Sequence, residues 1–400
     1  MATLIPCRAL RPTPADAAQI AAVPYDVVST DEARALAHGN PLSFLRVSRA
    51  ELELPDEVDP YSKAVYERAA DNFRMLKDAS LVLEDEPSVY LYRLVMGVHT
   101  QTGIAACFSI DEYDRDVIRK HERTRRDKED DRTRHLIALG AQTGPVFLTY
   151  RAANDIDAIV ARDTAGPPLF EFTAPDGVRH AIWRVGGGDR DALVSAFARV
   201  PTLYIADGHH RAASAARART ELGGRGESGA MLAVAFPHDQ VQILSYNRAV
   251  KDLGGRSPDD FMQAVRDRFE IEAGQGAPER RGRIAMYVRG AWHMLTPRVA
   301  PIASDPIGSL DVSILQEQLL APVLKIADVR TDKRIEFVGG ARGTKALEQL
   351  VESGKAAVAF ALFPVSVADL MAVSDAGEIM PPKSTWFEPK LRDGLLIHLI

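Results

Sequence analysis

The stretch Ala-Asp-Gly-His-His-Arg-Ala-Ala-Ser-Ala-Ala-Arg at residues 206–217 decides the fold of this chain. It follows a short apolar run at 203–205, and nothing in its alanine-rich part stops a helix before Gly223. An apolar run, a glycine turn and a series of strong helix formers are typical of a strand that leads into a helix. We therefore predict a strand that ends near residue 206, a turn at Gly208 and a helix that ends near Gly223.

The predicted turn also carries the polar groups. Gly208 permits a positive φ or a close backbone approach, and the free amides of the first helical turn attract an anion. Asp207, His209, His210 and Arg211 add one acid, two imidazoles and a guanidinium. An Asp before a Gly can be a simple helix cap, but two histidines beside an arginine carry charge and solvation costs that a cap does not require. A phosphate group is the ligand that this combination favours.

The composition sets the broad class of the protein. Its 400 residues are 46% hydrophobic and 26% charged, which is typical of a soluble globular chain with two or three lobes. A net charge of −6 argues against nucleic-acid binding through broad neutralisation of phosphates. Cys7 and Cys107 are the only cysteines, so we expect neither a disulfide framework nor a cysteine metal cluster. No targeting segment or apolar run of about 20 residues is present, and we expect a cytoplasmic protein without membrane contact.

A rigid turn, Pro-Tyr-Asp at 24–26, presents an acid near the N-terminus. Ser29 or Thr30 caps a predicted helix that ends near Gly39, and we expect a strand at 43–47. The turn is either purely structural or faces a ligand, and the residues leave both interpretations open. In the second interpretation, five side chains of this region lie at the ligand: Tyr25, Asp26, Asn40, Ser43 and Arg46.

Residues 112–135 form the densest ionic stretch of the chain. Such a charge run is usually a solvated helix face. Its His121-Glu122 pair lacks the second histidine of a zinc motif, because Arg125 stands at that position. If the stretch folds over the turn at Gly208 as a lid, its cations clamp phosphate oxygens and its acids hold Mg²⁺ or accept a proton. The cations are Lys120, Lys128 and Arg132, and the acids are Glu122 and Asp131.

The other segments alternate between helix and strand patterns, which predicts an α/β or α+β body with a mixed sheet. Gly254-Gly255 is the best boundary and predicts lobes at 1–254 and 255–400. We expect a helix at 60–80, a hairpin over 89–110, a strand at 144–150, a helix from Ser257-Pro258, strands at 283–288, 291–295 and 356–363, and helices at 311–324 and 344–353. Two loops of the second lobe carry donors that suit phosphate or substrate, although solvated loops share this composition: Arg334 and Lys383-Ser384-Thr385.

Five motifs in this order together resemble the domain-of-unknown-function 1015 family, and they span nearly the whole chain. They are Pro-Tyr-Asp-Val-Val from residue 24, Lys-His-Glu-Arg-Thr from 120 with Lys128 and Asp131-Arg132, Asp-Gly-His-His-Arg from 207, Arg-Ile-Glu-Phe from 334 and Pro-Lys-Ser-Thr-Trp-Phe from 382. The Gly208 turn alone resembles the Gly-x-x-Arg turn of the ParB/sulfiredoxin-like fold, which includes kinases of free serine.

The resemblance implies a ParB/sulfiredoxin-like nucleotide-binding core in the first lobe and an additional C-terminal α/β lobe that contributes site loops. It also implies a phosphotransferase that makes O-phospho-L-serine from free L-serine, with Mg²⁺ and with ATP, ADP or pyrophosphate as donor. Sulfiredoxins carry a cysteine in this turn where this chain has His209, so their thiol chemistry is excluded. The alternatives are a non-catalytic nucleotide- or phosphate-binding regulator and a phosphatase or nucleotidase. The expected partners are small molecules, and a homodimer is the one assembly considered.

A kinase of this type needs a base for the hydroxyl proton of its acceptor. We rank Asp207, Glu122 and Asp26 in that order, because neighbouring cations would keep each carboxylate ionised. Transient phosphorylation of His209 or His210 is the alternative to direct transfer. Five cations are candidates for the acceptor carboxylate or the donor tail: Lys120, Arg132, Lys333, Arg334 and Lys383.

Overall fold

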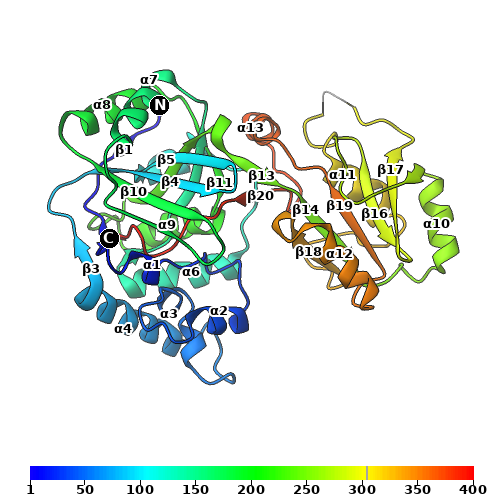
Figure 1. The fold of residues 1–400 in the computed structure, drawn as a ribbon, viewed down its shortest axis with the longest axis horizontal. Coiled ribbons are helices and arrows are strands. Elements are labelled where there is room, and N and C mark those ends of the chain that lie inside the picture. Colours follow the sequence, from blue (N-terminus) through cyan, green and yellow to red (C-terminus); the bar gives the residue numbers. More distant parts are fainter. Residues whose placement is uncertain (303–304) are drawn as a thin grey trace. The chain divides into compact units, whose positions relative to one another are not determined.

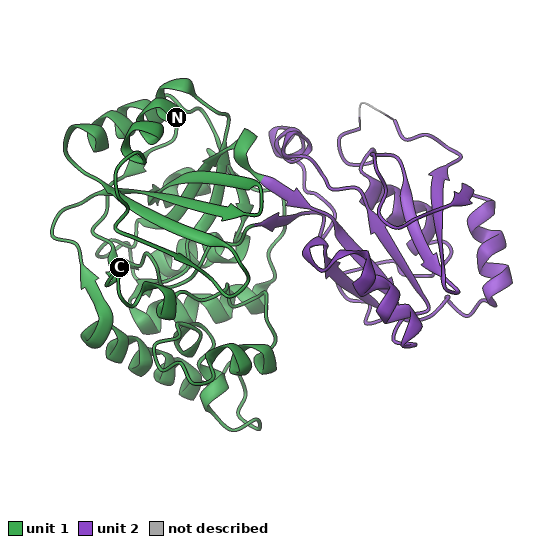
Figure 2. Ribbon diagram, in the orientation of Figure 1, with its two compact units in different colours: residues 1–241, 389–400 green, residues 242–388 purple. Residues whose placement is uncertain are grey.

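A computed structural model describes residues 1–302 and 305–400. The chain forms two compact units (Figure 2). The first contains Met1–Val241 and Pro389–Ile400, and the second contains Gln242–Glu388. The boundary that we expected after residue 254 therefore falls instead after Val241, and residues 389–400 return to the first unit rather than ending the second.

A nine-stranded mixed sheet forms the centre of the first unit (Figure 1). Its order is β6-β11-β8-β12-β5-β4-β10-β9, with β1 beside β5. The pairs β6/β11 and β8/β12 are parallel, and the other neighbours are antiparallel. The strands are β1 (Leu4–Ile5), β4 (Val89–Met96), β5 (His99–Ser109), β6 (Ile118–Arg119), β8 (Val146–Tyr150), β9 (Phe170–Thr173), β10 (Arg179–Val185), β11 (Leu203–Asp207) and β12 (Ala230–Pro237). Two short pairs join β2 (Leu10–Pro12) to β3 (Leu81–Leu83) and β7 (Ala141–Gln142) to β21 (His398–Leu399).

Helices cover this sheet and complete the core of the first unit. They are α1 (Ala17–Ile20), α2 (Thr30–Ala37), α3 (Leu45–Ser48), α4 (Lys63–Ser80), α5 (Ile110–Asp114), α6 (Arg126–Leu139), α7 (Asn154–Asp163), α8 (Gly187–Phe197) and α9 (His209–Glu221), with 3-10 turns at Ala50–Glu53 and His238–Gln240. α6 packs between α9 and α4, while α7 and α8 pack together away from α2, α3 and α4 (Figure 1). The buried apolar residues of the sheet meet those of α8 and α9 in one cluster. The α/β fold with a mixed sheet that the sequence predicts is confirmed.

The predicted strand, turn and helix around Gly208 are confirmed. β11 ends at Asp207, Gly208 has φ 91°, and α9 begins at His209. α9 ends at Glu221, two residues before Gly223 with φ 64°. A Cβ at Gly208 would lie 3.2 Å from Nε of Arg211, so the positive φ and the close approach both favour glycine here.

The predicted strand at 43–47 is wrong, because residues 45–48 form a single helical turn, α3. The amides of Ser48 and Arg49 donate to the carbonyls of Phe44 and Leu45. Phe44, Leu45 and Val47 are buried in the cluster of the N-terminal helices. A short apolar run fits a buried helical turn as well as a strand, and its periodicity does not separate the two.

The second unit contains a six-stranded antiparallel sheet in the order β15-β17-β16-β19-β14-β18. Its strands are β13 (Gln242–Leu244), β14 (Tyr246–Val250), β15 (Phe269–Ala273), β16 (Ile284–Val288), β17 (Ala291–Pro297), β18 (Ile335–Gly339), β19 (Val358–Leu362) and β20 (Trp386–Glu388), of which β13 and β20 pair separately. Its helices are α10 (Pro258–Arg266), α11 (Asp311–Leu315), α12 (Gly343–Glu352) and α13 (Val367–Asp375), with a π-helical turn at Gln316–Leu320 and a 3-10 turn at Gly340–Arg342. The predicted cap at Ser257 is confirmed. The helix expected at 311–324 begins at Asp311 as α11, continues as the π-helical turn and ends at Leu320.

Both cysteines, Cys7 and Cys107, are buried free thiols. Among the described residues, no helix combines the length and apolar character that crossing a bilayer requires.

Candidate active site

Asp207, the last residue of β11, lies among cations at the start of α9. Its Oδ1 accepts a hydrogen bond from the Gly208 amide at 3.0 Å. Its Oδ2 accepts one from Nζ of Lys390 at 3.2 Å and lies 3.8 Å from Arg211. Burial opposes the ionisation of Asp207, but the charges of Lys390 and Arg211 outweigh this cost and hold its pKa well below the usual range. Asp207 is therefore a carboxylate at neutral pH.

The sequence reasoning did not assign Lys390 to the site. Lys390 lies 183 residues after Asp207 and reaches the site because residues 389–400 return to the first unit. Its side chain is 12% exposed and that of Asp207 is 30% exposed, so the ion pair is partly shielded from water. The motif from residue 382 ends shortly before Lys390, and no spacing in the sequence connects this lysine to the turn.

The two histidines of α9 bind the backbone of the ionic stretch. The His121 amide donates to Nε2 of His209 at 3.4 Å, and the Arg125 amide donates to Nε2 of His210 at 3.0 Å. Because Nε2 accepts in both rings, the neutral form of each carries its proton on Nδ1. Residues 121–125 thus lie across the start of α9, an arrangement that the sequence leaves open.

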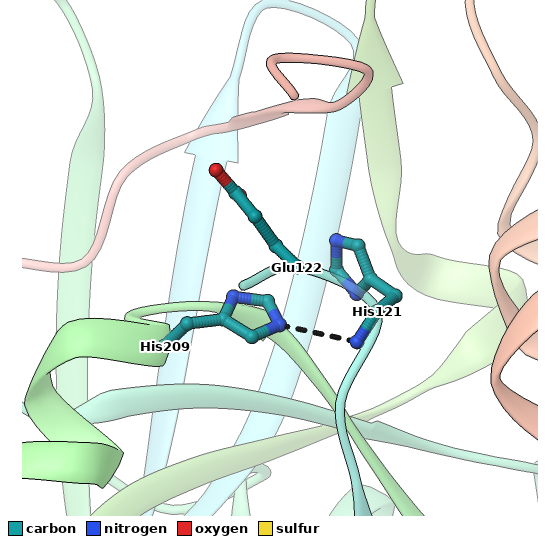
Figure 3. Close-up of side chains that lie close together, drawn as sticks. All are labelled: His121, Glu122 and His209. Atoms are coloured by element: carbon teal, nitrogen blue, oxygen red, sulfur yellow. Dashed lines mark hydrogen bonds between the residues drawn. The ribbon is translucent and has the colours of Figure 1, made fainter. Parts of the chain in front are cut away.

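Three side chains that can bind metals gather beside this turn: His121, Glu122 and His209 (Figure 3). Their ligand atoms lie within 4.8 Å of one another, and the two imidazoles meet edge to face with ring centroids 4.5 Å apart. Burial lowers the pKa of His121 to about 4 and holds the pKa of His209 well below its usual value. Both rings are therefore neutral at neutral pH.

The magnesium ligands that we expected were Glu122 and Asp131. Asp131 is buried, and both of its oxygens are occupied by the protein. Oδ1 accepts from the Tyr66 hydroxyl at 2.9 Å, and Oδ2 accepts from Arg132 at 2.7 Å. In residues 1–302 and 305–400, the group of potential metal ligands includes Glu122 but not Asp131. The structure thus gives Asp131 the position of an ion-pair partner for Arg132.

A small pocket adjoins the start of α9 and joins several predicted residues. Arg132 lies over the ring of Tyr25, with Cζ 4.2 Å from the ring centroid, and donates to the Ser48 carbonyl at 3.3 Å. Arg211 lines the same pocket and donates to the Pro145 carbonyl. Burial and the nearby Asp26 raise the pKa of Tyr25 well above its usual value, so its hydroxyl stays protonated. The pocket therefore presents two guanidinium groups and a phenol.

Asp393 also lines this pocket, and sequence reasoning missed it. The side chain is buried, and its carboxylate lies against Gly144, where a Cβ would collide with it. Burial raises the pKa of Asp393 to about 7, although the charges of Arg211 and Arg132 oppose this shift. Asp393 follows Lys390 by three residues, so both reach the site through the same C-terminal return.

Other predicted residues have structural contacts elsewhere in the first unit. The Asn40 amide donates to the Gln19 carbonyl at 2.8 Å, and Arg46 pairs with Glu53. Ser43 is buried beside them. Lys120 pairs with Asp116 at 3.1 Å, and Lys128 donates to the Tyr61 hydroxyl at 2.9 Å. Asp26 is exposed on its turn, but its charge acts on Tyr25 and Asp393 at the pocket. Their roles toward a ligand stay predictions.

The remaining predicted residues lie in the second unit. Arg334 pairs with Asp332 at 2.7 Å and donates to the Leu324 carbonyl at 3.0 Å. The Ser384 hydroxyl donates to the Pro381 carbonyl at 2.6 Å. Nζ of Lys383 lies 5.7 Å from the ring centroid of Tyr246. The binding roles of Arg334, Lys383, Ser384 and Thr385 stay predictions.

Comparisons place the chain among known sequences and structures. The model of a family described as "Protein of unknown function (DUF1015)" matches residues 4–313. No curated protein matches the chain. Among solved structures, a free serine kinase in complex with AMP is 14% identical over 74% of this chain and 92% of its own, with a TM-score of 0.39. SbnI with a C-terminal truncation from Staphylococcus aureus is 15% identical over 74% and 87%, with a TM-score of 0.41. A conserved hypothetical protein from Pyrococcus furiosus is 16% identical over 76% and 97%, with a TM-score of 0.37.

Proposed function

Because this chain belongs to the DUF1015 family, whose description names no activity, we infer its function from its own site. We propose that it is a small-molecule phosphotransferase. In its specific form, it is a kinase that transfers phosphate from ATP, ADP or pyrophosphate to the hydroxyl of free L-serine. The observation that carries the proposal is the convergence of Lys390, Arg211 and Asp207 at the start of α9. The choice of serine comes from the resemblance of the Asp-Gly-His-His-Arg turn to free serine kinases.

The start of α9 supports a phosphate cradle. The helix is 13 residues long, its N-cap is Gly208, and no acidic side chain lies in its first turn. The positive end of the helix dipole and its amides therefore face the turn without a side-chain cap. Lys390 and Arg211 add two positive charges, which balance the charge that spreads over the phosphoryl oxygens during transfer.

Asp207 is the first candidate for contact with the acceptor hydroxyl. Its low pKa keeps it ionised, so it accepts a hydrogen bond from the hydroxyl and takes up the proton as the oxygen–phosphorus bond forms. The bond from phosphorus to the leaving group of the donor breaks in the same transfer. Glu122 and Asp26 remain the second and third candidates. Direct transfer is favoured over a phosphohistidine, because Nε2 of both His209 and His210 accepts a backbone amide.

Mg²⁺ fits this site as a partner of the donor phosphates. It prefers oxygen ligands and commonly binds one or two carboxylates together with phosphate oxygens. Glu122 is the carboxylate beside the turn that suits it, whereas the imidazoles of His121 and His209 suit softer metals better. When bound, the ion would neutralise charge on the donor.

The test is a transfer assay with L-serine, Mg²⁺ and each of ATP, ADP and pyrophosphate in turn. Phosphorus NMR and mass spectrometry would follow the appearance of O-phospho-L-serine, and we expect product with at least one donor. Tight donor binding without product from any donor would instead support the regulator. Phosphate release that does not depend on serine would support the hydrolase.

A further inference from the structure

The carboxylate of Asp393 faces the pocket and has no protein partner among the described residues. The residue is 4% exposed. Within residues 1–302 and 305–400, no group donates a hydrogen bond to this carboxylate, and no cationic side chain forms an ion pair with it. Buried polar groups in proteins are nearly always hydrogen-bonded, because an unsatisfied one costs free energy. A carboxylate that faces the pocket without a protein partner is available to a ligand that donates hydrogen bonds to it.

The groups that face Asp393 are mainly cations. Arg211, Arg132 and Arg392 lower its pKa, while Asp26 raises it. Arg392 is occupied on its other side, because it pairs with Asp176 and donates to His180. Burial lowers the pKa of His135, which also lines the pocket, to about 4, so its ring is neutral. The charged groups that line the pocket are therefore the acid Asp393 and two guanidinium groups. Arg132 also pairs with Asp131, and Arg211 lies 3.8 Å from Asp207.

The size of the pocket restricts the ligand. The pocket has a volume of about 50 Å³. One bound water needs about 10 to 15 Å³ by the same measure, so this volume suits a small molecule rather than a nucleotide. The Asp393 carboxylate and the guanidinium groups of Arg132 and Arg211 lie at the same pocket but form no ion pair with each other. A small molecule with one positive and one negative charge can therefore contact both.

We propose that this pocket binds a small α-amino acid, with its ammonium group on Asp393 and its carboxylate between Arg132 and Arg211. This inference deepens the proposed function and rests on it for the role of the amino acid as phosphate acceptor. Arg211 links the two sites, since it lines the pocket and also lies 3.8 Å from Asp207. A hydroxyl on the bound amino acid thus has a route to the phosphate cradle.

Calorimetric titration without any phosphate donor tests the inference. The ligands are L-serine, 3-hydroxypropionate, which lacks the ammonium group, and ethanolamine, which lacks the carboxylate. We expect the wild-type protein to bind L-serine, and each analogue about 10- to 100-fold more weakly, because each leaves a buried charge unsatisfied. Asp393→Asn should weaken L-serine binding by a similar factor while leaving 3-hydroxypropionate unchanged or tighter. Asp78→Asn on the exposed face of α4 is the matched control.

Equal L-serine affinity in Asp393→Asn and in the control would overturn the inference, and so would a wild-type protein that binds no amino acid at millimolar concentrations. Failure of the proposed function has a different signature. In that case L-serine binds and Asp393→Asn weakens it, but no donor yields O-phospho-L-serine. Transfer to an acceptor without an ammonium group would uphold a phosphotransferase while overturning this inference.

Discussion

The carboxylate of Asp207 owes its ionised state to residues that approach it from two segments of the chain. Arg211 follows it by one helical turn, and Lys390 comes from the C-terminal return. A neutral amide in its place would keep the shape of the side chain but lose both the negative charge and the ability to take up a proton. The consequence is confined to the turn, because β11 and α9 are held by their own backbone hydrogen bonds.

Asp207→Asn should lower kcat for phosphate transfer by about 100-fold or more, the scale on which a single charged group acts in a transition state. Steady-state kinetics, with circular dichroism to verify the fold, would measure this. The control is Asp78→Asn, which should retain the wild-type rate. A folded Asp207→Asn protein with an unchanged rate would remove Asp207 from its proposed role.

Asp393 makes the stability of the first unit depend on pH. Its pKa rises from 3.8 in the unfolded chain to about 7 in the fold, so the native state binds the proton more tightly. The contribution of Asp393 to the free energy of unfolding is fully present below pH 3.8 and is lost as pH rises to about 7. The difference between the two pKa values corresponds to about 4 kcal/mol in the free energy of unfolding.

Asp393→Asn removes the titrating carboxyl group, so the free energy of unfolding no longer falls at this site as pH rises. The variant should match the wild type near pH 4 and exceed it in free energy of unfolding above pH 7, by up to about 4 kcal/mol. Urea unfolding at several pH values without ligand would measure the difference. A variant that is less stable than the wild type at pH 8 would show that the Asp393 carboxylate has a stabilising partner.

At the scale of elements, α9 holds the segment between β6 and α6 through its first two side chains. Histidine suits this task because a neutral ring offers one accepting nitrogen to a backbone amide, and a protonated ring offers none. His121 and His209 stay neutral under ordinary conditions because burial lowers the pKa of both. The pair of histidines in the turn therefore has a structural use beside any contact with phosphate.

His210→Ala should loosen residues 121–126, because the Arg125 amide loses its acceptor. Loss of one hydrogen bond of about 1 kcal/mol raises the exchange of the affected amides about fivefold. Hydrogen exchange followed by mass spectrometry would detect this. His238 accepts the Ala152 amide through Nδ1, so His238→Ala should speed exchange at Ala152 and leave 121–126 unaffected. The interpretation fails if both variants exchange alike at 121–126.

The sequence predicts the parts of the site that local chemistry determines. The strand, turn and helix around Gly208 and the cap at Ser257 follow from residues within a few positions of each other. The turn of α3 was misjudged, because burial of Leu45 and Val47 depends on helices that pack from elsewhere. Lys390 and Asp393 could not be found, because their partners lie far away along the chain.

For the whole molecule, the decisive feature is that the second unit is inserted into the first. Residues 389–400 return to pair β21 with β7, and Leu10 and Ile397 exchange two backbone hydrogen bonds at 2.9 Å. Leu395, Leu396 and Ile397 are almost fully buried there. The first unit therefore takes its core, as well as Lys390 and Asp393, from both sides of the insertion.

Deletion of residues 389–400 should destabilise the first unit by several kcal/mol. Burial of each of the three large apolar side chains contributes about 1.5 to 3 kcal/mol, and their sum approaches the total stability of a typical domain. Thermal unfolding of the shortened and the full chain would measure the effect. An unchanged unfolding temperature would mean that the C-terminal return adds nothing to the core.

The insertion also imposes an order on biosynthesis. The second unit is continuous in sequence, so its sheet can close while the ribosome is still adding residues. β7 can form its hydrogen bonds with β21 only after the complete second unit has been synthesised, because β21 follows that unit in the sequence. During that interval the edge of β7 and the apolar residues under it stay open to solvent, which makes the half-made first unit a natural client for chaperones.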